Sequence, residues 1–137
     1  MQYLLDTDTS SYVIRGGYPD LDRRLASMPP SDVCISSITR AELLYGVRRR
    51  PEAHHLARVV GQFLARIRSL PWDDEAAERF ASIAAELDAS GRRIGTFDTM
   101  IAAHALATGA VVVTNNVEHF SRVTGVAVEN WTGTPRA

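Results

Sequence analysis

The chain has 137 residues, 45% of them hydrophobic and 23% charged, which suits a single folded domain over residues 1–137. The formal net charge of −1 excludes a general nucleic-acid coat protein, which would be clearly basic. No apolar run approaches the roughly 18 to 20 residues that span a membrane. The acidic residues at positions 6 and 8 do not fit a signal peptide, so we expect a cytoplasmic protein without membrane contact.

The fifteen basic residues are all arginine, which removes lysine-dependent chemistry from consideration. The single cysteine, Cys34, lies in the apolar stretch VCIS. An intrachain disulfide is therefore impossible, and we expect a buried, unreactive thiol. The four histidines lack the spacing of a zinc site, so packing or surface roles are expected for them.

Short runs rich in valine, isoleucine and leucine predict strands at residues 2–5, 32–36, 69–72, 111–114 and 126–128. They lack strict alternation of polar and apolar residues, which is typical of strands buried on both faces of a parallel sheet. Apolar side chains three and four positions apart predict helices over 56–67, 76–87 and 100–105, with Gly91 and Gly109 closing the last two. This alternation predicts an α/β fold, with a mostly parallel central sheet of about five strands flanked by helices.

Four polar side chains fall at the ends of these elements. Asp6 ends the first strand, and Glu42 lies in the first turn of the helix that follows the second strand. Asp98 opens the helix that leads into the fourth strand, and Asn116 follows that strand. Because the carboxyl ends of parallel strands gather along one edge of a sheet, we expect all four side chains to meet there.

The acidic residues also have structural interpretations. These are helix capping by Asp6 or Asp8 near Thr9, a capping box Thr39-x-x-Glu42, and a dipole-favoured Asp98 with Thr96 as the cap. Together, however, carboxylates that converge on one edge repel one another unless a cation lies between them. The chain has no lysine, and no arginine adjoins Asp6 or Asp98 in sequence. A divalent metal is the simplest counter-charge, and oxygen ligands favour Mg²⁺ or Mn²⁺.

The segment Asp6-Thr7-Asp8-Thr9-Ser10 is similar to the Asp-x-Asp motif of haloacid-dehalogenase-like phosphatases. That family also needs a downstream lysine and a pair of aspartates after a later strand. This chain has no lysine and carries Asn115-Asn116 after its fourth strand. A phosphatase is therefore kept only as an alternative.

Five segments together resemble the PIN-domain ribonuclease toxins of the VapC type, which belong to bacterial toxin–antitoxin systems. In the family's order and spacing, they are YLLDTDTSSYVIRG, CISSITRAELLYGV, GTFDTMIAAHALATG, VVVTNNVEHFSRV and VAVENW. The resemblance covers essentially the whole chain and implies a PIN-like fold. It also implies that Asp6, Glu42 and Asp98 are the core acidic residues, with Asn116 at a fourth position and Thr114 supporting the metal site.

The resemblance implies a metal-dependent endoribonuclease in which Asp6 and Asp98 hold Mg²⁺ or Mn²⁺ directly. Asp8 stands where the family commonly has Asn, so it could add a metal contact or only make the site more acidic. Since the chain has no lysine, arginine must bind the RNA. The candidates are the arginines near the motifs, namely Arg15, Arg92 and Arg93.

The same resemblance implies a homodimer that pairs with a VapB-type antitoxin, as a heterotetramer or a larger assembly. It favours a tRNA substrate, because the TNN and ENW features are similar to those of tRNA-cutting members, and it implies products with 5′-phosphate and 3′-hydroxyl ends. Asp8 and Asn116 leave one alternative open: a binding module with lost catalytic power that acts with its antitoxin as a DNA-bound repressor.

Overall fold

The computed structural model describes residues 1–133; the last four residues of the expected domain, 134–137, lie outside the described residues. Five parallel strands form one sheet in the order β3-β2-β1-β4-β5. They are β1 (Tyr3–Leu5), β2 (Val33–Ser36), β3 (Arg68–Leu70), β4 (Val111–Val113) and β5 (Val128–Glu129). The predicted α/β fold with a parallel five-stranded sheet is therefore confirmed.

Neighbouring residues of each central strand enter different cores, one on each face of the sheet. Leu4 and Val112 belong to one core, whereas Leu5 and Val113 belong to the other. Both faces are covered, so the residues of β1 and β4 are largely apolar at successive positions and the sequence shows no alternation. Cys34 lies in the first core, and burial raises the pKa of its thiol, which agrees with the expected unreactive cysteine.

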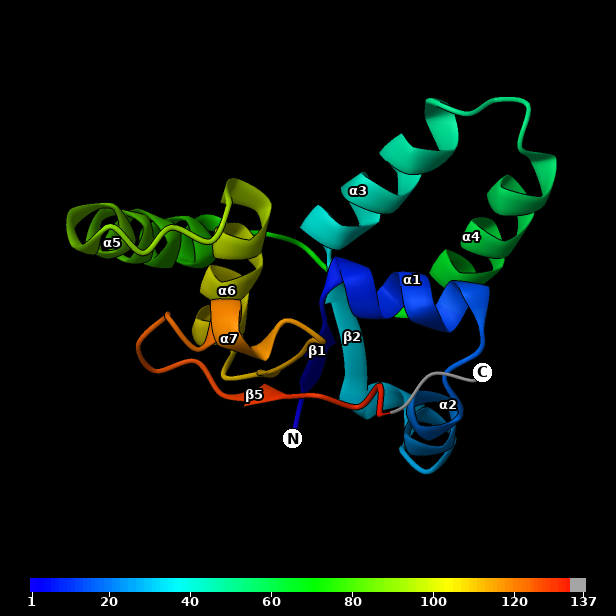
Figure 1. Cartoon of the computed structure of the whole chain (residues 1–137), viewed down its shortest axis with the longest axis horizontal. Helices are drawn as coiled ribbons and strands as arrows, with labels where there is room; N and C mark the ends of the chain where they lie inside the picture. Colours follow the sequence, from blue (N-terminus) through cyan, green and yellow to red (C-terminus); the bar gives the residue numbers. More distant parts are fainter. Residues whose placement is uncertain (134–137) are drawn as a thin grey trace.

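Helices cover the two faces of the sheet in two groups (Figure 1). One group consists of α1 (Thr7–Arg15), α2 (Pro19–Ala26), α3 (Ser37–Arg48) and α4 (His54–Arg66), with a short 3₁₀ turn at Pro30–Asp32. The other consists of α5 (Asp74–Ser90), α6 (Thr96–Thr108) and the short α7 (Val117–Phe120). Both α5 and α6 end at a glycine in the left-handed region, Gly91 and Gly109, as the sequence predicts. Within residues 1–133, no helix is both long and apolar enough to cross a membrane.

The starts of α3 and α6 correct two expectations. Helix α3 begins directly after β2, because the Ser36 hydroxyl accepts a hydrogen bond from the Ile38 amide at 3.1 Å and caps it. Glu42 therefore lies in the second turn rather than the first, and Thr39-x-x-Glu42 is not a capping box. In α6 the capping position is Gly95, so Thr96 is the first helical residue and not the cap.

Candidate active site

The sheet order creates a switch point between β1 and β4, where the chain changes the direction in which it adds strands. In open parallel sheets, ligands bind in the crevice outside the carboxyl ends of the strands at such a point. Asp6 follows β1 there, and its backbone amide donates to the Val113 carbonyl of β4 at 3.0 Å. Only 2% of Asp6 is exposed, so its carboxylate lies within this crevice rather than in solvent.

Each oxygen of the Asp6 carboxylate accepts a hydrogen bond. Oδ1 accepts from the Thr9 amide at 2.8 Å and caps α1, while Oδ2 accepts from the Thr114 hydroxyl at 2.6 Å. The backbone amide of Asn116 in turn donates to Thr114 Oγ1 at 2.8 Å. Burial raises the pKa of Asp6, and the hydrogen bonds from Thr114 and Thr9 oppose that rise. The capping interpretation of Asp6 is thus correct, and capping leaves the carboxylate at the switch point.

Glu42 reaches the same edge from α3. Its Oε1 accepts a hydrogen bond from the Thr7 hydroxyl at 2.6 Å, and that hydroxyl lies 3.0 Å from the hydroxyl of the buried Thr39. Thr7 sits between Asp6 and Asp8 in sequence, so this contact ties α3 to the first acidic segment. Burial raises the pKa of Glu42, and the charges of Asp8 and Asp6 add to the rise.

Asp98, in the first turn of α6, completes an acidic cluster. Its pKa is raised from 3.8 to about 6, mainly by burial and in addition by the negative charges of Asp6, Asp8 and Glu42. Carboxylates from α1, α3 and α6 therefore repel one another at one edge of the sheet. We name the four residues Asp6, Asp8, Glu42 and Asp98 the acidic cluster.

The composition of the acidic cluster fits a hard divalent cation. Its donors are all carboxylate oxygens, which Mg²⁺ and Mn²⁺ prefer, and its mutual repulsion falls when a positive charge lies among the donors. Among residues 1–133, however, no three acidic, histidine or cysteine side chains already stand close enough together to enclose an ion. Asp6 and Asp98 remain the sequence-based candidates for direct ligands.

The structure does not bring the Asn116 side chain into contact with the acidic cluster. Its amide nitrogen donates to Nδ1 of His119 at 2.8 Å, toward α7. Asn116 instead reaches Asp6 indirectly, through its backbone amide and Thr114. The direction of the side chain depends on His119, three residues later, for which only a packing or surface role was expected.

A groove of about 1030 Å³ opens beside the acidic cluster and is lined by residues of α1, α3 and α4 together with Phe97. Asp8, Glu42 and Arg15 are among its lining residues. Arg15, a candidate RNA-binding residue, thus lies at the groove, with its guanidinium 5.2 Å from the centroid of the Tyr12 ring. Sequence reasoning missed the exposed aromatic residues Tyr45 and Phe97, which also line it.

The other two candidate RNA-binding residues lie elsewhere. Arg92 and Arg93 are exposed in the loop between α5 and α6, and neither lines the groove. Nε of Arg93 donates to Asp88 Oδ1 at 2.6 Å, so this arginine already has a negative partner. Their proposed contact with RNA stays a prediction.

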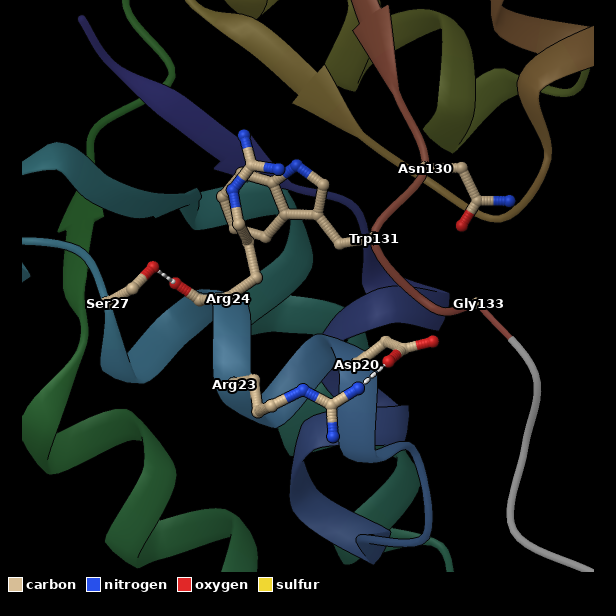
Figure 2. A pocket seen from close by; sticks show the side chains of 7 residues that line it. All are labelled: Asp20, Arg23, Arg24, Ser27, Asn130, Trp131 and Gly133. Carbon is tan, nitrogen blue, oxygen red and sulfur yellow. Dashed lines mark hydrogen bonds and ion pairs between the residues drawn. The ribbon is translucent and has the colours of Figure 1, made fainter.

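A second hollow, of about 460 Å³, lies between α2 and the segment after β5 (Figure 2). Its charged groups already have partners: Arg23 donates a hydrogen bond to Asp20, and the Arg24 guanidinium lies 4.9 Å from the Trp131 ring centroid. Glu129 accepts from both the Trp131 indole, at 2.9 Å, and Arg24, at 3.3 Å. These contacts anchor the chain after β5 to α2, so the tryptophan of the ENW feature serves packing.

Fold and site together define an α/β protein with an acidic cluster at the switch point of a parallel sheet. Residues 3–126 match the model of the PIN domain family. The chain is 38% identical over 131 residues to the tRNA(fMet)-specific endonuclease VapC of Salmonella typhimurium, covering 96% of this chain and 98% of that protein.

Solved structures agree with this match. The DNA-bound VapBC of Salmonella typhimurium is similar with a TM-score of 0.89 and 37% identity, over 96% of this chain and 98% of the compared chain. VapBC2 of Rickettsia felis, bound to a promoter DNA fragment, is similar with a TM-score of 0.88 and 31% identity, over 96% of this chain and 99% of the compared chain. The chain therefore belongs to the VapC group of the PIN-domain family, and the haloacid-dehalogenase-like alternative is set aside.

Proposed function

We propose that the protein is a single-domain VapC-type toxin, a metal-dependent endoribonuclease that cleaves tRNA in the cytoplasm. The observation that carries this proposal is the convergence of Asp6, Glu42 and Asp98, from the start of α1, from α3 and from α6, on one edge of the sheet. Burial is the main cause of the raised pKa of Asp98, and the charges of Asp6, Asp8 and Glu42 add to the rise, which supports their proximity. The named activity of the Salmonella relative supports tRNA as the substrate class.

In this proposal, Asp6 and Asp98 hold Mg²⁺ or Mn²⁺, and Glu42 and Asn116 complete the site, directly or through water. A bound divalent cation supplies positive charge for the phosphate oxygens and makes the attacking water more acidic. Thr114 and the start of α1 fix the orientation of the Asp6 carboxylate. Hydrolysis would leave 5′-phosphate and 3′-hydroxyl ends.

The hydroxyl of Thr7 fixes Glu42 through one carboxylate oxygen, Oε1. The other oxygen can then orient a water or accept a proton at the reacting phosphate. Burial raises the pKa of Glu42 toward neutral pH, and a group that accepts and donates protons works best when its pKa is near the working pH. Asp8, which is exposed at the rim of the groove, adds negative charge that strengthens cation binding.

We further propose that the toxin forms a homodimer and is neutralised by a VapB-type antitoxin, in a heterotetramer or a larger assembly. The similar solved structures support this partner, since they are VapBC complexes from Salmonella typhimurium and Rickettsia felis. Both of those complexes are bound to DNA.

A second candidate function is a catalytically weak binding module within such a DNA-bound repressor complex. Two observations favour it: the Asn116 side chain contacts His119 instead of the acidic cluster, and the similar complexes carry DNA. In that case, the toxin chain would serve mainly to hold its antitoxin.

Purified toxin, free of antitoxin and incubated with total tRNA, separates the two functions. The nuclease predicts discrete fragments that require Mg²⁺ or Mn²⁺ and that disappear when the metal is chelated. Asp6→Asn and Asp98→Asn should lower the cleavage rate by about 100-fold or more, because each removes charge that organises the reacting centre. Asp22→Asn, which changes an exposed carboxylate on α2 outside the groove, is the matched control and should cleave normally. Intact tRNA after incubation with folded, metal-loaded protein would support the binding module instead.

A further inference from the structure

Two aromatic side chains are exposed beside the acidic cluster. Tyr45 is 64% exposed and Phe97 is 55% exposed, and both line the groove that also contains Asp8 and Glu42. Neither belongs to the two hydrophobic cores. Single exposed apolar residues are common on protein surfaces, but two aromatic rings that line one groove form a larger apolar surface of the kind that marks binding sites.

Each of these aromatic residues is tied by its helix to an acidic residue. Tyr45 lies three residues after Glu42 on α3, so the two side chains share one side of that helix. Phe97 immediately precedes Asp98 in the first turn of α6. The rings therefore stand on two separate rigid elements, next to the residues proposed to act on the scissile phosphate.

Two arginines line the same groove as Tyr45 and Phe97. The guanidinium of Arg49 is 5.6 Å from the centroid of the Tyr45 ring, and both Arg49 and Arg15 line the groove. Within residues 1–133, neither arginine forms an ion pair, so both charges are available to a ligand. Aromatic faces next to unpaired arginines are complementary to a ligand that carries flat rings on a negative backbone.

Single-stranded RNA has this chemistry, since its bases stack on aromatic side chains and its phosphates pair with arginine. Paired bases are already stacked within the duplex and cannot reach such rings. We propose that Tyr45 and Phe97 stack unpaired nucleobases of the substrate in the groove beside the scissile phosphate, while Arg49 contacts a neighbouring phosphate. This inference rests on the proposed ribonuclease function and limits its substrate to an unpaired segment.

Binding can be measured apart from cleavage in the Asp6→Asn background, with a fluorescein-labelled single-stranded RNA of about 12 nucleotides. Phe97→Leu and Tyr45→Leu should each weaken binding by about 5- to 100-fold, because stacking of one base is lost. Phe97→Trp and Tyr45→Phe keep a ring and should restore binding. Val117→Ala, which shortens an exposed apolar side chain outside the groove, is the control.

A second probe tests stacking itself. The same RNA with abasic nucleotides should bind the parent protein more weakly but should bind the two leucine variants with little further loss. In the otherwise wild-type enzyme, the leucine changes should raise KM for tRNA more than they lower kcat.

The outcomes distinguish this inference from the function on which it rests. If the wild type cleaves tRNA and both leucine variants bind and cleave as their parents do, stacking is wrong and the nuclease stands. If the leucine variants keep RNA binding but lose the homodimer mass or antitoxin binding, the two rings belong to a protein interface and the inference is again wrong. If the wild type cleaves no RNA, the nuclease proposal fails, whatever the binding result.

Discussion

The two oxygens of the Asp6 carboxylate divide their hydrogen bonds between the start of α1 and the Thr114 hydroxyl at the end of β4. Capping and catalysis are often treated as competing explanations for an acidic residue, but here the cap is what fixes the orientation of the side chain. Because α1 begins directly after Asp6, the helix start and the switch point of the sheet lie at the same place. A single residue can therefore serve the fold and the site together.

The hydroxyl of Thr7 holds the Glu42 carboxylate in position, and this role can be tested by mutation. Thr7→Val keeps the shape of the side chain but removes the donor to Glu42, and hydrogen bonds to charged groups contribute about 1.5–3 kcal/mol. We expect kcat for tRNA cleavage to fall by about 10-fold or more, with little change in KM. Thr7→Ser keeps the donor and should restore kcat. Equal kcat in Thr7→Val and wild type would show that the Thr7 contact has no part in the reaction.

Asp98 should destabilise the metal-free protein at neutral pH. Because its pKa is raised from 3.8 to about 6, the folded state binds the proton more tightly than the unfolded state. The resulting loss of stability is complete above about pH 6 and disappears as the pH falls from 6 toward 4.

Thermal unfolding in the presence of a chelator tests this sign. Asp98→Asn should melt at a higher temperature than wild type at pH 7.5, and the difference should shrink at pH 5. Added Mg²⁺ should raise the melting temperature of wild type and not that of the variant. A variant that melts below wild type at pH 7.5 would contradict repulsion within the acidic cluster.

The limits of helices and strands were predicted correctly where a local feature, such as a helix-ending glycine, sets them. The predictions were wrong where pairing with a distant strand sets the limits. The run that predicts a strand over 126–128 has its ladder at Val128–Glu129, because pairing with β4 matches Val112 to Val128 and Val113 to Glu129. Val126 packs against the core, yet its amide donates to the Val123 carbonyl in a turn. Hydrophobicity thus identified burial there, but not membership of the sheet.

The site shows the same division between local and distant contacts. The positions of Asp6 and Asp98 follow from element order, since each adjoins the end of a strand or the start of a helix on one edge. The contact between Thr7 and Glu42 joins residues 35 positions apart, and no local pattern indicates it. Likewise, Arg93 pairs with Asp88 across the turn at Gly91. The two adjacent arginines of that loop gave no indication in the sequence that one of them has this acidic partner.

Gly61 lies in the interior of α4, and its replacement by alanine should change the stability of that helix. A Cβ added at Gly61 would meet no atom within 4 Å, and its φ is not positive. Gly61→Ala should therefore raise the free energy of unfolding by about 0.5–1 kcal/mol, as alanine lowers the backbone entropy lost on folding. Gly95→Ala, at φ +99°, should instead lower it. Denaturant unfolding measures both, and a destabilised Gly61→Ala would contradict the helical environment described here.

Across the whole molecule, the net charge of −1 limits how RNA is held. Among the groove-lining arginines of residues 1–133, Arg50 pairs with Glu52, whereas Arg15 and Arg49 form no ion pair, so few phosphates are contacted and affinity should depend weakly on salt. With Arg15 and Arg49 as the contacts, the slope of log K against log salt should be about −1.4 for a single strand. Arg15→Ala should reduce its magnitude by about 0.7.

The same titration tests the predicted contacts of Arg92 and Arg93: if both also contact phosphates, each should make the wild-type slope steeper by about 0.7, and each alanine variant should lose that increment. Unchanged slopes for these two variants would confine the phosphate contacts to the groove. A slope several times steeper in the wild type would instead indicate a broad basic surface, which the composition does not provide.

The most direct test of the acidic cluster is a titration of the purified protein with Mn²⁺, followed by electron paramagnetic resonance. If carboxylates from three helices share one ion, wild type binds Mn²⁺ saturably, Asp6→Asn and Asp98→Asn lose that binding, and Asp22→Asn retains it. Equal Mn²⁺ binding by wild type and Asp98→Asn, or no binding by folded wild type, would contradict the shared site.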